Sequence, residues 1–185
     1  MDTPVLQSDR LTLRPVRESD ADRLQMLAGE RQVAATTLNI PHPYPLAAAV
    51  AFINQMQEQA AAGIAYTFGL VLKTEDALIG CIGLRVAQAF SRAEIGYWVG
   101  VPYWGQGYMS EAARRVLAFA FDDLGLHRVY ASHFASNPAS GRVMQKIGMQ
   151  YEATLRDHVA KWDTYHDLVY YGILRDEYEA NGAGS

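Results

Sequence analysis

The sequence predicts an α+β fold, an α/β sandwich in which a mixed sheet carries helices on its faces. Segments that alternate apolar and polar side chains, the period of a strand, are interspersed with segments whose apolar side chains follow the period of a helix. Half of the 185 residues are apolar, which suffices for a core at this length. No repeat or linker interrupts the pattern, so we expect one domain over residues 1–185, ordered from about 8 to 178 and frayed over 180–185.

The N-terminal part predicts a strand followed by two helices. Residues 10–16 (RLTLRPV) alternate apolar and polar side chains as a half-buried strand does. Ser19 and, three residues later, Asp22 have the pattern of a helix N-cap, which predicts a helix through about Leu27. After the proline-rich turn IPHPYP, the alanine-rich segment 46–62 predicts a second helix that ends at the next glycine.

The middle of the chain predicts three strands and then a crossover. Strand-like segments cover 66–73, 78–86 and 93–99, and the short link KTED makes the first two a hairpin. Residues 109–123 place their apolar side chains on one helical face, and 127–134 reads as another strand. The strand, helix and strand over 94–134 predict a parallel pair with a right-handed crossover.

The C-terminal part predicts a helix and two strands. Asn137 followed by Pro138 is typical of a helix start, and Gly148 ends the segment. The strand-like segments 150–157 and 164–174 follow. The predicted order of elements is therefore β-α-α-β-β-β-α-β-α-β-β.

Composition argues against several functional classes. The net charge is −4 and Lys and Arg form no block, so we expect no nucleic-acid partner, because such binding depends on neutralising phosphates. No apolar run approaches the roughly 20 residues that cross a bilayer, and the first residues lack the pattern of a secretion signal, so we expect no membrane partner and a cytoplasmic location. The one cysteine, Cys81, lies in an apolar strand and is expected to be buried. The five histidines show no short metal-ligand spacing, so we expect no metal.

Two glycines, Gly105 and Gly107, lie just before the helical segment 109–123 in the stretch YWGQGYMSEA. Glycine lets main-chain N–H groups approach a ligand closely, and the first amides of a helix favour an anion, so the stretch predicts a phosphate site. A nucleotide-binding P-loop is excluded because no lysine follows Gly107. A dinucleotide fold is a poor match, because the third glycine of G-x-G-x-x-G is replaced by Ser110 and the glycines do not follow the strand directly.

Two spaced motifs carry a resemblance to a known family. The segment 93–149 resembles the GNAT N-acetyltransferases, and most closely their RimJ/RimL branch, which acetylates the N-termini of ribosomal proteins. The family motif Q/R-x-x-G-x-G/A corresponds to WGQGYM, with Trp104 and Met109 at the two positions that depart from it. The second motif opens the next helix as NPAS and closes it as KIGM. The resemblance extends over nearly the whole chain.

The resemblance implies a GNAT fold, in which the mixed sheet is mostly antiparallel and two parallel strands splay apart. It also implies acetyl-CoA as the acyl donor, bound where the strands part, since a parted edge has main-chain groups that a ligand can pair. A main-chain N–H near Trp98 would face the thioester oxygen. The residues implied to contact acetyl-CoA are Tyr97, Trp98, Val99, Trp104, Gly105, Gln106, Gly107, Tyr108, Met109, Ser110, Asn137 and Ser140.

Direct transfer to an amine requires a base that takes a proton from the amine and an acid for the leaving thiolate. Glu94, at the start of the strand that points into the cleft, is the candidate base, and the alternative is a strand-end carboxylate bonded to a loop. The resemblance implies Ser140 as the acid, and the alternative is contact with acetyl-CoA or the backbone alone. Tyr130 stays open as another acid.

The function implied is acetyl-CoA-dependent transfer of acetyl to a primary amine, with a protein or peptide N-terminal α-amine as the first choice. The acidic composition also allows a polyamine, an amino acid or an aminoglycoside. A weakly catalytic acyl-CoA sensor is an alternative of another class, and a nicotinamide-binding fragment a more distant one. By resemblance, Arg14, Arg17, His42 and Tyr44 flank the acceptor side. The expected partners are acetyl-CoA and an amine, and the expected state is a monomer or a homodimer.

Overall fold

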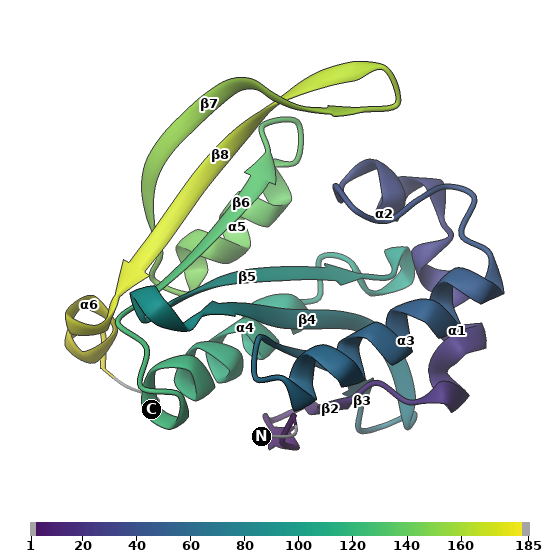
Figure 1. The fold of residues 1–185 in the computed structure, drawn as a ribbon, viewed down its shortest axis with the longest axis horizontal. Helices are drawn as coiled ribbons and strands as arrows, with labels where there is room; N and C mark the ends of the chain where they lie inside the picture. Colours follow the sequence, from purple (N-terminus) through teal and green to yellow (C-terminus); the bar gives the residue numbers. More distant parts are fainter. Residues whose placement is uncertain (1–2, 183–185) are drawn as a thin grey trace.

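The structure is a computed structural model that describes residues 3–182. Eight strands form one sheet in the order β1-β2-β3-β4-β5-β6-β8-β7, with helices on both faces (Figure 1). The strands are β1 (Leu6–Gln7), β2 (Leu11–Pro15), β3 (Ala65–Leu72), β4 (Ala77–Ala87), β5 (Arg92–Val99), β6 (Arg128–Phe134), β7 (Gln150–Lys161) and β8 (Thr164–Leu174). The α-helices are α1 (Ala21–Ala28), α2 (Arg31–Ala35), α3 (Leu46–Ala61), α4 (Tyr108–Ala118), α5 (Pro138–Lys146) and α6 (Arg175–Ala180).

Neighbouring strands are antiparallel except β5 and β6, which run parallel. This confirms the mixed, mostly antiparallel sheet with one parallel pair. The pair is short, because only residues 92–94 of β5 lie opposite residues 128–130 of β6. Beyond Glu94 the two strands part, and β6 continues with β8 and β7 as a separate wing of the sheet (Figure 1).

Two hydrophobic clusters lie on opposite faces of the sheet. The larger one joins α4 and α5 to the strands, and its Phe119 ring packs edge-on against Phe68, with ring centres 5.7 Å apart. The smaller one lies between the sheet and the helices α1 and α3, and includes Ile53 and Cys81. Cys81 is buried, as expected, and this burial raises the pKa of its thiol.

Two of the predicted helices differ from the structure at an end. Residues 18–20 form a 3-10 turn before α1, and the Asp20 carboxylate accepts the Arg17 N–H at 2.8 Å, so Ser19 is not the N-cap. The helix predicted over residues 109–123 is α-helical only to Ala118, and Phe119–Asp123 forms a π-helical turn. The larger cluster absorbs that turn, because Phe119 and Phe121 are both buried.

Two short α-helices, one short strand and one strand extension were not predicted. β1, α2 and α6 are the short elements, and β7 extends from Gln150 to Lys161 instead of ending at Asp157. Residues 175–180 are helical, and 183–185 of the predicted frayed tail lie outside the described residues. Among residues 3–182, none of the helices is long and apolar enough to cross a membrane.

Candidate active site

The outer edge of β5 faces the gap left by β6. The Gly100 N–H donates to the Ile79 carbonyl of β4 at 2.9 Å. Main-chain groups alternate between the two edges of a strand, so Trp98 also bonds toward β4, whereas Tyr97 and Val99 direct theirs toward the gap. The Val99 carbonyl there accepts a hydrogen bond from the Trp104 indole N–H at 2.7 Å. Within residues 3–182, the remaining edge groups of Tyr97 and Val99 have no strand partner.

A glycine loop adjoins this edge and leads into α4. Gly105 has φ +74° and Gly107, the N-cap of α4, has φ +82°, which is the left-handed region that glycine adopts most easily. The first amides of α4 follow at once and lack helical acceptors. Met109 and Ser110 are buried, whereas Trp104 is 41% exposed. The loop therefore presents main-chain N–H groups and the positive end of a helix at the gap.

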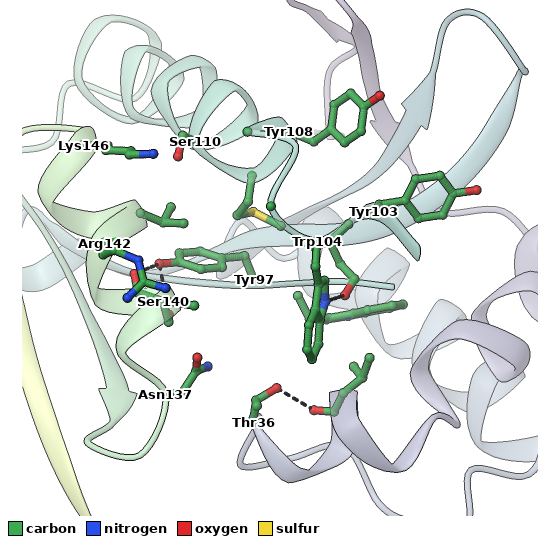
Figure 2. A pocket seen from close by; sticks show the side chains of 18 of the residues that line it. Thr36, Tyr97, Tyr103, Trp104, Tyr108, Ser110, Asn137, Ser140, Arg142 and Lys146 are labelled. Carbon is green, nitrogen blue, oxygen red and sulfur yellow. Dashed lines mark hydrogen bonds between the residues drawn. The ribbon is translucent and has the colours of Figure 1, made fainter. Parts of the chain in front are cut away.

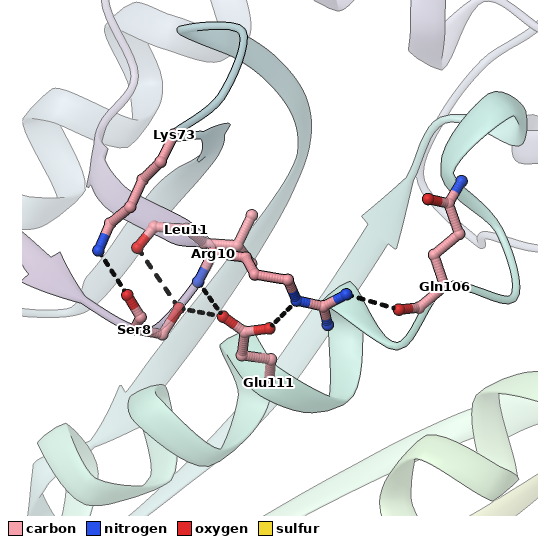
Figure 3. A network of polar contacts seen from close by, with 6 residues as sticks. All are labelled: Ser8, Arg10, Leu11, Lys73, Gln106 and Glu111. Atoms are coloured by element: carbon pink, nitrogen blue, oxygen red, sulfur yellow. Dashed lines mark hydrogen bonds and ion pairs between the residues drawn. The ribbon is translucent and has the colours of Figure 1, made fainter.

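A polar network fixes the same loop from outside (Figure 3). The Arg10 guanidinium donates to the Glu111 carboxylate at 2.7 Å and to the Gln106 carbonyl at 3.0 Å. The carboxylate also accepts the Arg10 N–H and the Ser8 hydroxyl, each at 2.7 Å. Burial opposes ionisation of Glu111, but these hydrogen bonds outweigh it and lower the pKa of the carboxyl. The chain before β2 thus holds the glycine loop through α4.

Helix α5 forms the other side of the gap. Asn137 is its N-cap, but its side chain makes no capping bond and lies toward the pocket (Figure 2). Ser140 lies one turn further on, and Arg142 and Lys146, four residues apart, add two cationic side chains. The glycine loop and these cations make one end of the site suited to an anion.

Two hydroxyls join β5 to α5 across the gap. The Tyr97 hydroxyl donates to the Ser140 carbonyl at 3.0 Å, and the Ser140 hydroxyl donates to the Tyr97 oxygen at 3.1 Å (Figure 2). Burial raises the pKa of Tyr97 to about 12, although the Ser140 bond acts in the opposite direction. Tyr97 is therefore a neutral phenol at ordinary pH, which can donate and accept hydrogen bonds but is a weak acid.

These elements enclose a cavity of about 280 Å³ (Figure 2). It brings together Tyr97, Trp98, Val99, Trp104, Gly105, Gly107, Tyr108, Met109, Ser110, Asn137 and Ser140 from the sequence-based set. Gln106 and Glu94 are not among its lining residues. Gln106 instead meets Arg10 through its carbonyl and Pro102 through its side-chain amide.

Glu94 lies at the point where the strands part, as the last residue of β5 opposite β6. Side chains alternate along a strand, so Glu94 shares a face with Trp98 and lies opposite the face of Tyr97. Its neighbours across the sheet are Arg85 of β4 and Tyr130 of β6. Residues directly opposite each other in a sheet share a face, so the Glu94 and Tyr130 side chains lie on one face. Burial raises the pKa of Tyr130, and the Glu94 charge adds to the effect.

The cavity also has lining residues that were not proposed as site residues. Arg142 and Lys146 lie three and seven residues after Ala139, which also lines the cavity, so the periodicity of a helix face through Ala139 could have indicated them. Val33, Thr36 and Thr37 come from α2 and the turn after it, and no pattern in that segment indicated a pocket. Among the described residues, no group of three His, Cys, Asp or Glu side chains could hold a metal ion.

Comparison with known proteins adds the family. Residues 10–150 match the acetyltransferase (GNAT) domain family. The chain belongs to the GNAT family and is an N-acetyltransferase. It is 30% identical to the uncharacterized N-acetyltransferase YoaA of Bacillus subtilis over 173 residues, which cover 93% of this chain and 97% of YoaA.

Other relatives of this GNAT enzyme have more specific names. It is 28% identical to the [ribosomal protein uS5]-alanine N-acetyltransferase of Escherichia coli over 162 residues, covering 83% of this chain and 82% of the relative. Its fold matches that of Mycobacterium smegmatis RimJ, solved in complex with CoA-disulfide, with a TM-score of 0.84, 20% identity and coverage of 99% and 98% of the two chains. The expected GNAT fold, resemblance and enzyme class are thereby confirmed.

Proposed function

We propose that this GNAT enzyme transfers acetyl from acetyl-CoA to the α-amine of a protein or peptide N-terminus. The observation that carries the proposal is the parting of β5 and β6 beside the glycine loop, which offers a strand edge and an anion site to one elongated ligand. The name of the E. coli relative, an alanine N-acetyltransferase of a ribosomal protein, supports an N-terminal acceptor. The CoA compound in the RimJ structure supports the donor.

The residues of the cavity fit acetyl-CoA. The loop amides between Gly105 and Ser110, with Arg142 and Lys146, would hold its phosphates. The open edge of Tyr97 and Val99 would pair with the amides of its pantetheine arm, and Asn137 would contribute its uncommitted side-chain amide. When bound, acetyl-CoA supplies the thioester carbonyl, and a β5 amide on the open edge would stabilise negative charge on that oxygen.

The chain's own groups would then manage the protons. An amine attacks only when neutral, so Glu94 would take the proton of the ammonium through water. The amine nitrogen bonds to the acetyl carbon as the carbon–sulfur bond breaks. The nitrogen loses one more proton as the amide forms, and the sulfur of CoA gains one proton as it leaves, so that the products are an amide and a thiol. Ser140, whose hydroxyl donates to the Tyr97 oxygen in this structure, would turn that donor to the sulfur as it leaves and stabilise it by a hydrogen bond.

The first experiment is thiol release from acetyl-CoA against a panel of amines. The panel contains peptides that begin with Ser, Ala, Met or Thr, the same peptides with a blocked α-amine, spermidine, single amino acids and an aminoglycoside. Saturable turnover with an unblocked peptide and none with its blocked partner supports the proposal. Turnover with a small amine and with none of the peptides would mean that the acceptor is a small-molecule amine and not a protein N-terminus. Tight CoA binding without turnover on any amine favours an acyl-CoA sensor.

A further inference from the structure

The tip of the β7–β8 hairpin docks on α2 and the segment after it, about 120 residues away in the sequence (Figure 1). The Lys161 ammonium donates to the carbonyl oxygens of Ala34 at 2.6 Å and Ile40 at 2.9 Å. It also contacts the carbonyls of Thr37 and Leu38. One side chain thus ties together the carboxyl end of α2 and the turn that follows, and its charge suits the negative end of a helix.

Trp162 adds a second contact at the same place. Its ring lies 5.4 Å from the Arg31 guanidinium and 6.2 Å from the His42 ring, edge to face. Trp162 and Asp163 form the two-residue turn of the hairpin with φ +51° and +59°. Such turns favour Asn-Gly because other residues are strained at positive φ. A bulky side chain held in this conformation indicates that its contacts with Arg31 and His42 matter.

The segment held by Lys161 is also a wall of the cavity. Val33, Thr36 and Thr37 line it. Figure 2 shows Thr36 near Asn137, away from Ser110 and Lys146 at the other end. The cationic end suits the phosphates of acetyl-CoA, so the wall made by α2 lies at the end left for the acyl group and the amine.

We propose that Lys161 is a positioning residue for the acceptor: by gathering four carbonyls it sets the position of the α2 wall against which the incoming amine is held. This inference rests on the proposed function, because it assigns the α2 end of the cavity to the acceptor. Lys161 itself does not line the cavity, so it acts through residues 33–40. Removal of the Lys161 ammonium should therefore weaken acceptor binding and leave acetyl-CoA binding unchanged.

The test compares Lys161→Met with Lys73→Met in the full chain. Lys73 is a matched control for the α2 wall, because its ammonium also donates to a main-chain carbonyl, that of Ser8 at 2.6 Å, beside the network that holds the glycine loop (Figure 3). We expect Lys161→Met to raise the KM of the best acceptor about tenfold, within the range that a displaced positioning group costs. The KM of acetyl-CoA should stay within about twofold in Lys161→Met, and Lys73→Met should leave the KM of the acceptor unchanged. Equal loss for both substrates, or no change in acceptor KM, overturns the proposal.

Two further variants separate positioning from stability. Trp162→Gly relieves the strained turn while removing the ring that meets Arg31 and His42, so the protein should keep its melting temperature while acceptor KM rises. Lys161→Arg keeps the charge and should recover part of the acceptor affinity. A Trp162→Gly variant with unchanged acceptor KM contradicts a positioning role even if Lys161→Met unfolds.

Hydrogen exchange gives a readout that needs no acceptor. In Lys161→Met, amides of residues 33–40 should exchange at least about tenfold faster, with Lys73→Met as the unchanged control. Faster exchange in an enzyme that acetylates none of the peptides would support the hold of Lys161 on residues 33–40 and refute only the proposed acceptor. Unchanged exchange would refute that hold whatever the acceptor is.

Discussion

Tyr97 and Ser140 form a closed pair of hydroxyls, in which each oxygen already has a partner. Since burial raises the pKa of Tyr97 to about 12, the phenol stays protonated through the working pH range. A phenol of that pKa is a weaker acid than a thiol, whose pKa is about 8.5. Tyr97 should therefore hold the Ser140 hydroxyl in place rather than transfer a proton itself.

Tyr97→Phe tests this role, because it keeps the ring and removes only the hydroxyl. We expect kcat to fall about tenfold, the value of one hydrogen bond, with acetyl-CoA affinity unchanged. The pH profile of the parent enzyme should show no alkaline loss from Tyr97 below about pH 11, since its pKa is raised. Tyr178→Phe is the control, because its hydroxyl bonds to Asp122 outside the cavity. An alkaline limb near pH 9 that the Phe variant abolishes would contradict a neutral phenol.

Glu94→Gln tests the proposed base. The amide keeps the size of the side chain but cannot accept a proton, so kcat/KM should fall about 100-fold near neutral pH. Binding of CoA, measured by calorimetry, should not change, because Glu94 does not line the cavity. Glu58→Gln, an exposed position on α3, is the control. Retention of full activity in Glu94→Gln would leave Glu94 as a strand-end carboxylate.

Sequence reasoning located most of the cavity residues but not their directions. Glycine positions and the NPAS motif indicated the loop and the start of α5, both of which line the cavity, because backbone freedom and helix starts have local sequence signals. The alternation along β5, which separates the face of Glu94 from that of Tyr97, is a local property of the sequence. The hydroxyl pair of Tyr97 and Ser140 was not accessible, since it joins two elements 43 residues apart.

At the scale of elements, the glycine loop and α4 act as one unit. Gly107 has φ +82°, and a Cβ there would meet only the Arg10 guanidinium, at 3.5 Å. The position thus has room for a side chain, and the conformation is what opposes one. Gly63, with φ +70° and open space around it, has the same backbone constraint at the end of α3, away from the cavity.

Gly107→Val and Gly63→Val therefore form a matched pair. Both should lower the melting temperature by a similar amount, because each forces a β-branched residue into the left-handed region at a cost of about 1–2 kcal/mol. Only Gly107→Val should weaken CoA binding, by about tenfold or more in Kd, since the strain at this position would displace the loop amides that face the phosphates. Equal CoA affinity in two folded variants would remove the glycine loop from the donor site.

The network around Glu111 predicts a dependence of stability on pH. Its pKa is lowered in the folded chain, so Glu111 stabilises the fold above the ordinary carboxyl pKa of about 4.3, and that contribution disappears as pH falls through the lower folded value. Glu111→Gln should thus lower the free energy of unfolding at pH 7. The difference from the parent should shrink below about pH 4, measured by urea unfolding. A difference that is independent of pH would mean that packing, not charge, holds the loop.

The elements that the sequence predicted are those with their own periodicity and end signals, such as α3, α4 and the β3–β4 hairpin. α2 was missed because its five residues are too few to show a period, and because distant groups hold it, Lys161 above all. The predicted strand over 150–157 ended too early, because β7 continues to Lys161. Asp157 has φ +46° and the register with β8 shifts around it, so the strand pattern is interrupted there without the strand ending.

At the scale of the molecule, the sheet separates two hydrophobic clusters that support different helices. The larger one supports α4 and α5, which form the cavity, and the smaller one packs α1 and α3. The β5 strand contributes to both, since Tyr97 packs against the larger cluster and Trp98 against the smaller. Ligand binding at β5 should therefore stabilise both faces together.

Cys81 reports on that coupling, because it is buried in the smaller cluster and lies outside the cavity. Burial and a raised pKa both protect the thiol, so iodoacetamide should label it only when the chain opens. If opening is global, acetyl-CoA without an acceptor should slow labelling, measured by mass spectrometry of the protein, by about 100-fold at 100 times its Kd. If α1 and α3 open alone, the labelling rate should not depend on acetyl-CoA. The first result would show that both clusters unfold as one unit, and the second would separate the half that binds the donor from the half that covers Cys81.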